Sequence, residues 1–232
     1  PLVCAHAHND YEHTRPLLDA LDNGFCSVEA DIWLIDGQLF VSHNAKDVNQ
    51  ERTLQALYLD PLQKRMEKNG GAIYAKGLSV TLLVDIKSDP VQTYQALAHV
   101  LKDYEKMLTR FHQDRTETNA VTVIITGRSP RQMMNEEKGR LAGFEGRLKD
   151  LGCGETPSFM PLISDKWVTH FKWDGKGPMS AEERSKLDKL VARTHQEGKR
   201  LRFWRIPDSP LAWGTLLDAG VDLINVDNLV AF

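Results

Sequence analysis

The chain has 232 residues, of which 41% are hydrophobic and 26% are charged, and its formal net charge is −3. This composition is typical of a globular protein, and the length suits one barrel-sized domain covering residues 1–232. The near-neutral charge argues against a nucleic-acid partner, and no apolar run approaches the ~18 residues of a membrane span. Nothing in the pattern specifies an oligomeric state.

Strand and helix patterns alternate along the chain, which predicts βα units around a parallel sheet. We expect strands at residues 2–7, 26–33, 79–87, 121–125, 141–144, 160–163, 201–204 and 223–226. Helices are expected between them, beginning at Thr14 and at residues 90–111, 180–197 and 210–219. The pattern predicts an α/β fold, a single (β/α)8 TIM barrel, and it leaves open whether all eight βα units are regular.

Residues 44–77 form an excursion after the second strand that is too long for a plain βα loop. It contains a Leu- and Tyr-rich segment at 54–66 that is typical of a helix. A lid over the substrate and a packed structural insert are both consistent with this segment.

Two carboxylates, Glu29 and Asp31, lie two residues apart in the apolar segment 27–33. Side chains i and i+2 of a strand project from the same face, so the two are expected side by side. A cation would relieve their repulsion and lost hydration, and oxygen ligands favour Mg²⁺ or Ca²⁺ over zinc. The pair therefore predicts a metal site, with a solvated edge-strand face as the alternative.

Asp85 and Lys87 repeat this spacing at the end of the run 79–87. The run is almost continuously hydrophobic, which is typical of a strand buried on both faces of a parallel sheet. Charged residues at the carboxyl end of such a strand lie where α/β folds bind ligands. We expect Asp85 to add a third metal oxygen and Lys87 to hold an anionic substrate.

Histidines follow two of the apolar runs. His8 comes after the first strand, and His43 closes the run 39–41, twelve residues after Asp31. His6 shares a strand face with His8, and an HxH pair also opens metal-dependent amidohydrolase and phosphoesterase barrels, with Asp227 in their closing position. Because the middle strands offer no further histidines at their ends, we interpret His6 as a core residue.

The motifs AHNDY, GFCSVEADIW, VSH and VDIK together carry a family resemblance. Their order resembles the phosphatidylinositol-specific phospholipase C-like and glycerophosphodiester phosphodiesterase superfamily, and is most similar to its bacterial and fungal phosphodiesterase-like branch. The chain differs from glycerophosphodiesterases at the first motif, where they have His-Arg-Gly and this chain has His8, Asn9 and Asp10.

The resemblance implies a metal-dependent phosphoric diester hydrolase that acts on a small-molecule or lipid phosphodiester, such as a phospholipid or glycerophosphodiester. His8 and His43 would be the general acid and base, and Lys87 would add positive charge. One divalent cation, Mg²⁺ or Ca²⁺, would be held by Glu29, Asp31, Asp85 and Asn9. Attack by a substrate hydroxyl would give a cyclic phosphate, and attack by water would hydrolyse the diester directly.

Two alternative functions stay open, an HxH-type hydrolase and a noncatalytic lipid- or phosphate-binding barrel. Trp204 and Arg205 follow each other near the end of the seventh strand, where an aromatic ring and a guanidinium could contact substrate. The chain begins at Pro1 without an initiator Met, which is consistent with removal of a signal peptide, so an exported protein is expected.

Overall fold

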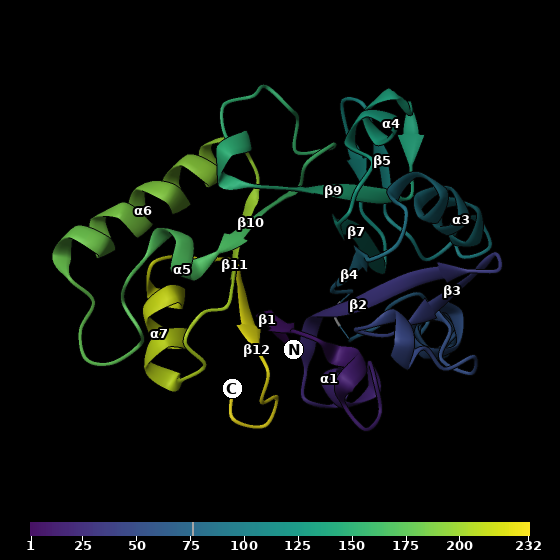
Figure 1. The fold of residues 1–232 in the computed structure, drawn as a ribbon, viewed down its shortest axis with the longest axis horizontal. Coiled ribbons are helices and arrows are strands. Elements are labelled where there is room, and N and C mark those ends of the chain that lie inside the picture. The colour runs from purple at the N-terminus through teal and green to yellow at the C-terminus, as the bar shows by residue number, and fades with distance from the viewer. Residues whose placement is uncertain (76) are drawn as a thin grey trace.

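Eight parallel strands form a closed barrel in the computed structural model of the protein, which describes residues 1–75 and 77–232 (Figure 1). Their order is β1-β12-β11-β10-β9-β7-β4-β2, and pairing of β1 with β2 closes the ring. The barrel strands are β1 (Leu2–Ala7), β2 (Phe25–Ile35), β4 (Val80–Ile86), β7 (Val121–Gly127), β9 (Ala142–Gly146), β10 (Leu162–Lys166), β11 (Arg200–Trp204) and β12 (Leu223–Val226). The predicted (β/α)8 barrel is confirmed.

Alternation along the strands separates an outer core from the barrel interior. In β4, Leu82 and Val84 belong to the large core beneath the helices, whereas Leu83 belongs to a separate small cluster. That cluster takes one residue from each of four barrel strands: Leu83, Ile124, Leu162 and Leu223. Because Leu83 shares its strand face with Asp85, the apolar cluster lies on the side of the sheet that also carries the polar site residues.

The helices cover the outside of the barrel, with α5, α6 and α7 beside β10, β11 and β12 (Figure 1). They are α1 (Leu18–Asp22), α2 (Asp60–Lys68), α3 (Pro90–Lys102), α4 (Arg131–Glu136), α5 (Trp167–His170), α6 (Ala181–Gln196) and α7 (Pro210–Asp218). Of the described helices, none combines the length and apolar composition that a membrane crossing needs. Only a 3₁₀ turn at Leu148–Asp150 lies between β9 and β10 in the described chain, so the barrel is irregular there.

The first helix begins later than Thr14, the position that the sequence predicts. The Asp10 carboxylate accepts a hydrogen bond from the backbone N–H of Leu17 at 2.5 Å, and Leu17 has a left-handed φ of 63°. This turn places the Leu17 side chain in the core, where it is completely buried. The helix therefore starts at Leu18, after the residue whose backbone departs from helical geometry.

The helix predicted at residues 90–111 ends at Lys102. Phe111 is buried, but it lies in β5 (Arg110–His112), part of a small antiparallel sheet with β6 (Thr116–Glu117) and β8 (Gly139–Arg140). The prediction overran because Leu108 and Phe111 are three residues apart, a spacing that continues the helical pattern although the chain has already turned.

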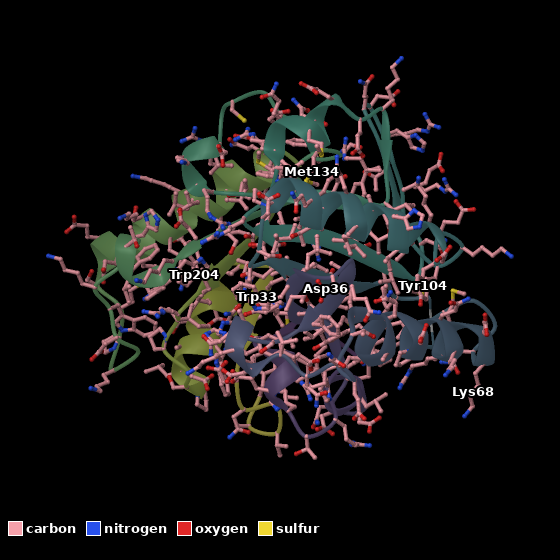
Figure 2. All side chains as sticks on the ribbon, turned by 45° about the vertical axis from the view of Figure 1, so that its right-hand side comes forward. Trp33, Asp36, Lys68, Tyr104, Met134 and Trp204 are labelled. Carbon is pink, nitrogen blue, oxygen red and sulfur yellow. The ribbon has the colours of Figure 1, made fainter. Side chains whose placement is uncertain are left out.

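The excursion between β2 and β4 is a packed insert. It follows β3 (Gln38–Val41), which pairs antiparallel with β2, and it contains a 3₁₀ turn at Ala45–Asp47 and a π-helical turn at Gln55–Leu59 that leads into α2. Tyr58 and Leu62 are fully buried in the main core, while α2 ends at Lys68, whose side chain extends away from the protein (Figure 2). Lys76, near the end of this excursion, lies outside the described residues.

Candidate active site

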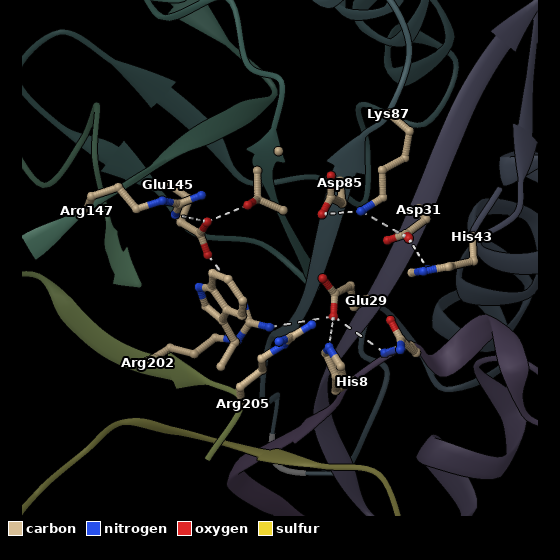
Figure 3. Close-up of a pocket in the computed structure, with 14 residues that line it drawn as sticks. His8, Glu29, Asp31, His43, Asp85, Lys87, Glu145, Arg147, Arg202 and Arg205 are labelled. Atoms are coloured by element: carbon tan, nitrogen blue, oxygen red, sulfur yellow. Dashed lines mark hydrogen bonds and ion pairs between the residues drawn. The ribbon is translucent and has the colours of Figure 1, made fainter. Parts of the chain in front are cut away.

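A cavity of about 430 Å³ opens at the carboxyl ends of the barrel strands (Figure 3). This is the end of a parallel barrel where side chains from separate strands converge. The cavity brings together the residues that the sequence predicts for the site: His8, Asn9, Glu29, Asp31, His43, Asp85 and Lys87. It is also lined by Thr126, Gly127, Glu145, Arg147, Arg202, Trp204 and Arg205.

Three carboxylates form a cluster in this cavity. Asp31 of β2 and Asp85 of β4 are direct neighbours in the parallel register, and Glu29 lies two residues before Asp31 on the same face. One oxygen of each of the three lies within 4.8 Å of the others. The spacing predicted from the sequence therefore places all three side chains at one point.

Glu29 is held by positive charge from the neighbouring strands. Burial raises its pKa, but the Arg202 guanidinium, whose Nη2 lies 3.5 Å from Glu29 Oε2, and a nearby His6 outweigh that effect. The pKa of Glu29 is consequently well below its usual value, and the side chain is ionised at neutral pH. Its Oε2 also accepts a hydrogen bond of 3.4 Å from the backbone N–H of Asn9.

Asp85 retains one buried oxygen without a partner among the described residues. Lys87 Nζ contacts Asp85 Oδ2 at 2.8 Å, whereas Oδ1 has no hydrogen-bond donor. Burial raises the pKa of Asp85 to about 6, and the Lys87 charge opposes that rise. A buried carboxylate oxygen without a donor is unfavourable unless a cation or proton reaches it.

Lys87 bridges two members of the cluster. Its Nζ lies 2.8 Å from Asp85 Oδ2 and 3.1 Å from Asp31 Oδ2. Burial lowers the pKa of Lys87, but the two carboxylates more than compensate and raise it. The ammonium group is therefore charged at neutral pH, at the edge of the carboxylate cluster.

His8 is oriented by a residue from the far end of the chain. Its Nδ1 lies 2.8 Å from Oδ1 of Asp227, the residue that directly follows β12, and its Nε2 lies 3.8 Å from Glu29 Oε2. Burial lowers the pKa of His8, but the Asp227 hydrogen bond and the Glu29 charge raise it by more than burial lowers it, so the net shift of this pKa is upward. The contact with Asp227 leaves Nε2 on the cavity side.

His43 approaches the cluster from the opposite side of Asp31 (Figure 3). Its Nδ1 lies 3.2 Å from Asp31 Oδ2 and 3.0 Å from the Tyr11 hydroxyl, which itself donates to Asp31 at 2.7 Å. More than half of the His43 side chain is exposed (55%), so its Nε2 is accessible to a ligand. Both histidines thus have one ring nitrogen beside a carboxylate.

Asn9 lines the cavity, and its backbone has a left-handed conformation with φ of 48°. Asparagine adopts this region more readily than most residues. Its side-chain Oδ1 lies 2.9 Å from the oxygen of the Tyr11 hydroxyl, whose single proton is donated to Asp31. The backbone N–H of Asn9 donates to Glu29 at 3.4 Å, so the residue is held in the cavity lining beside Glu29.

Buried polar residues of β9 and β11 also belong to the site, and the sequence reasoning missed them. Glu145 contacts Arg147 and Thr126, and its Oε1 lies 3.3 Å from Arg202 Nη1. The signal was the alternation of polar residues in Glu145-x-Arg147 and in Arg200-x-Arg202, which has the same two-residue spacing as the predicted pairs. The predicted strand at 141–144 ended one residue before Glu145.

The remaining aromatic and histidine candidates divide into two groups. Trp204 and Arg205 line the cavity, as their position at the end of a strand suggested. His6 is completely buried, with Nδ1 2.7 Å from Ser27 Oγ, and burial lowers its pKa to about 4. It therefore lies behind Glu29 in the core, with Nε2 3.7 Å from Glu29 Oε2.

The carboxylate cluster fits a divalent cation. Its donors are hard oxygens, two of the side chains are nearly fully buried, and the third, Asp85, has an oxygen that lacks a hydrogen-bond donor among the described residues. Gly127, with φ of +70°, approaches this carboxylate so closely that a side chain at position 127 would overlap Asp85 Oδ1. The backbone is thus shaped around the Asp85 carboxylate.

A solved structure shares the whole architecture. The glycerophosphodiester phosphodiesterase from Agrobacterium tumefaciens str. C58 superposes with a TM-score of 0.54 over 98% of this chain and 96% of its own, at 14% sequence identity. At this identity the similarity establishes the fold.

Fungal proteins are similar to the chain over almost its whole length. The "Altered inheritance of mitochondria protein 6 homolog" of Arthroderma benhamiae is 27% identical, over 99% of this chain and 82% of the relative. "Altered inheritance of mitochondria protein 6" of Eremothecium gossypii is 30% identical, over 99% of this chain and 68% of the relative. The Saccharomyces cerevisiae S288c protein of the same name is 28% identical, over 97% of this chain and 68% of the relative.

These names correct one expectation. They associate the relatives with mitochondrial inheritance, which contradicts the expectation of an exported protein. That expectation was wrong because it rested on a first residue other than Met, which carries no information about a cellular compartment.

A family model covers the segment that carries the strongest motifs. Residues 1–144 match the model described as "AIM6-like phosphodiesterase domain". This segment includes His8, Glu29, Asp31, His43 and Asp85, and the fungal relatives extend the similarity to the remaining strands. The chain therefore belongs to the family of AIM6-like phosphodiesterase domains.

Proposed function

We propose that the protein is a phosphoric diester hydrolase that depends on one divalent cation and acts on a phospholipid- or glycerophosphodiester-type substrate. The observation that carries the proposal is the carboxylate cluster, with oxygens of Glu29, Asp31 and Asp85 within 4.8 Å of one another. A histidine lies on each side of it, and each histidine has a carboxylate at Nδ1. This arrangement suits proton transfer on both sides of a phosphate.

Glu29, Asp31 and Asp85 would hold Mg²⁺ or Ca²⁺, and Asn9 would contribute its amide oxygen. When bound, such an ion supplies positive charge to a nonbridging phosphate oxygen. Lys87 adds a fixed charge next to it, because its Nζ already lies within 3.1 Å of two of these carboxylates. Positive charge at this point favours the extra negative charge of a pentacoordinate phosphorus.

His8 and His43 would perform the proton transfers. The Nε2 atom of one imidazole removes a proton from the attacking hydroxyl, and the Nε2 atom of the other donates a proton to the leaving oxygen. Asp227 and Asp31 fix the two rings through Nδ1, at 2.8 Å and 3.2 Å, so each Nε2 is directed away from its carboxylate. Attack by a substrate hydroxyl yields a cyclic phosphate, whereas attack by water yields the hydrolysed products.

The test is a turnover assay with glycerophosphodiesters, lysophospholipids, phosphatidylinositol and sphingomyelin, each with Mg²⁺, Ca²⁺ or a chelator. We expect turnover of at least one class that the chelator abolishes and that the His8→Ala protein lacks. His195→Ala is the matched control, because His195 also pairs with an aspartate at 2.8 Å but lies on α6 outside the cavity. Metal-independent turnover, or full activity of His8→Ala, would contradict the proposal.

A further inference from the structure

The cavity wall opposite Asp85 carries basic side chains. β4, which ends near Asp85 and Lys87, is separated from β11 by three strands in each direction around the barrel: β7, β9 and β10 on one side, and β2, β1 and β12 on the other. Trp204 ends β11 and Arg205 follows it, and both line the cavity. A ligand that reaches Asp85 therefore faces Arg205 across the opening.

Arg205 differs from the other basic residues of the cavity in its partners. Arg202 contacts Glu145 and donates to Asn225 at 2.7 Å, and Arg147 contacts Glu145. Within residues 1–75 and 77–232, Arg205 makes no hydrogen bond or ion pair, although Figure 3 shows its side chain extending into the cavity beside Arg202 and His8. Its guanidinium has free donors that could bind an anion.

The backbone at Arg205 is also unusual. Its φ of 55° lies in the left-handed region, which residues other than glycine, asparagine and aspartate seldom adopt. Such conformations concentrate at ligand-binding positions, where the surrounding structure holds them. The conformation directs a long cationic side chain over the cavity from the end of a rigid strand.

The charges of the cavity lining point to the same kind of ligand, independently of the backbone. Its four carboxylates (Glu29, Asp31, Asp85 and Glu145) balance its four basic residues (Lys87, Arg147, Arg202 and Arg205). With a divalent cation bound, the cavity would carry a net charge of two positive units, and the single negative charge of a phosphodiester would offset one of them. The lining therefore complements a ligand with one more negative charge than a simple phosphodiester carries.

We infer that Arg205 binds a second anionic group of the substrate, a carboxylate or a phosphomonoester distinct from the reacting phosphodiester. This inference rests on the proposed phosphodiesterase function. The neighbouring Trp204 ring already has the Lys166 ammonium 5.7 Å from its centroid. That cation disfavours a quaternary ammonium group on the same aromatic ring, so choline-type substrates should be the poorest.

The first test compares 4-nitrophenyl phosphodiesters whose second alcohol is ethanol, choline, glycolate or 2-hydroxyethyl phosphate. Relative to the ethyl diester, we expect kcat/KM to be about 10- to 100-fold higher for the two anionic diesters. The kcat/KM for the choline diester should be lower than that for the ethyl diester. The anionic diester with the higher kcat/KM shows whether Arg205 binds a carboxylate or a phosphomonoester. Equal kcat/KM for the anionic and ethyl diesters would overturn the inference.

Substitutions assign the preference to Arg205. Arg205→Gln should remove most of the anionic-to-ethyl ratio, and Arg205→Lys should restore part of it. Arg115→Gln, which removes an equal charge from a surface residue outside the cavity, should retain the ratio. If Arg205→Gln does not fold, Arg205→Gly replaces it, because glycine accepts the left-handed backbone. An unchanged ratio in the folded variant would refute the role of Arg205.

A binding experiment separates this inference from the proposed function. Phosphoglycolate and ethyl phosphate are titrated calorimetrically into the Mg²⁺-loaded protein and its Arg205→Gln variant. We expect phosphoglycolate to bind about tenfold more tightly than ethyl phosphate, with the difference lost in the variant. Equal affinities refute the second anion site, whereas a preserved difference without turnover of any diester refutes only the phosphodiesterase proposal.

Discussion

Gly127 lies directly against the carboxylate of Asp85, so that a Cβ atom at position 127 would overlap Asp85 Oδ1. The two residues belong to neighbouring strands, with Asp85 paired in register to Thr126. The absence of a side chain at this position is what allows the Asp85 carboxylate to take its place in the cluster.

Gly127→Ala should therefore weaken cation binding by displacing Asp85. We expect a loss of about tenfold or more in affinity for Mg²⁺ or Ca²⁺, measured by calorimetry, because one ligand of three is misplaced. Gly70→Ala is the matched control. Gly70 has a φ of +72° and no atom within 4 Å of the place that a methyl group would take, so it shares the backbone strain without the overlap. An equal loss of affinity in both variants would mean that strain alone is responsible.

Lys87 and Asp85 should respond differently to neutralisation. Lys87→Met removes a positive charge 2.8 Å from Asp85 and 3.1 Å from Asp31, so metal affinity should be kept or rise while turnover falls sharply. Asp85→Asn should weaken metal binding directly. Calorimetric titration of both proteins distinguishes the two roles, with Lys176→Met as a surface control. If Lys87→Met loses the cation as severely as Asp85→Asn, the two residues form a structural ion pair.

The two histidines should be separable by pH. His8→Ala and His43→Ala should each lower kcat by roughly 10²- to 10⁴-fold with little change in folding. Because the Asp227 hydrogen bond raises the pKa of His8 against the opposing effect of burial, Asp227→Asn should move one limb of the pH–rate profile to lower pH. Near-wild-type turnover of His43→Ala would show that this histidine is dispensable.

Cation binding should also depend on pH through Asp85. Burial raises the pKa of Asp85 from 3.8 to about 6, so its contribution to the stability of the cation-free protein is present below pH 3.8 and is lost as the pH rises through about 6. A bound cation compensates for this loss above pH 6 and competes with a proton below it. The rise in Tm caused by Mg²⁺ or Ca²⁺ should therefore be larger at pH 7.5 than at pH 5, and Asp85→Asn should abolish most of that difference. An equal rise at both pH values would contradict the assignment of Asp85 as a ligand.

The sequence was most informative where two charged residues share one face of an apolar strand. Glu29-x-Asp31 and Asp85-x-Lys87 could be placed together because strand geometry fixes the direction of alternate side chains, and parallel pairing puts Asp31 beside Asp85. Glu145 and Arg202 follow the same rule, but their strands are shorter and their apolar patterns weaker. Their contact also depends on β10 pairing with both β9 and β11, which local patterns do not encode.

Contacts between distant segments explain the other differences. The start of α1 depends on the Asp10 carboxylate reaching the Leu17 N–H, and the end of α3 depends on the chain turning to pair β5 with β8. Both are tertiary interactions that override a local helical pattern. The role of Asp227 as a partner of His8 likewise required the fold, because the two residues are 219 positions apart.

The closed ring of strands makes the proposed chemistry conditional on complete folding. β12 pairs with β1, and Asp227 reaches His8 only from the end of that last strand. A chain that ends before β12 cannot close the ring, and it also lacks the group that orients the His8 ring. Partially synthesised or C-terminally truncated chains should thus remain inert toward phosphodiesters, and cleavage activity would report that the final strand has paired.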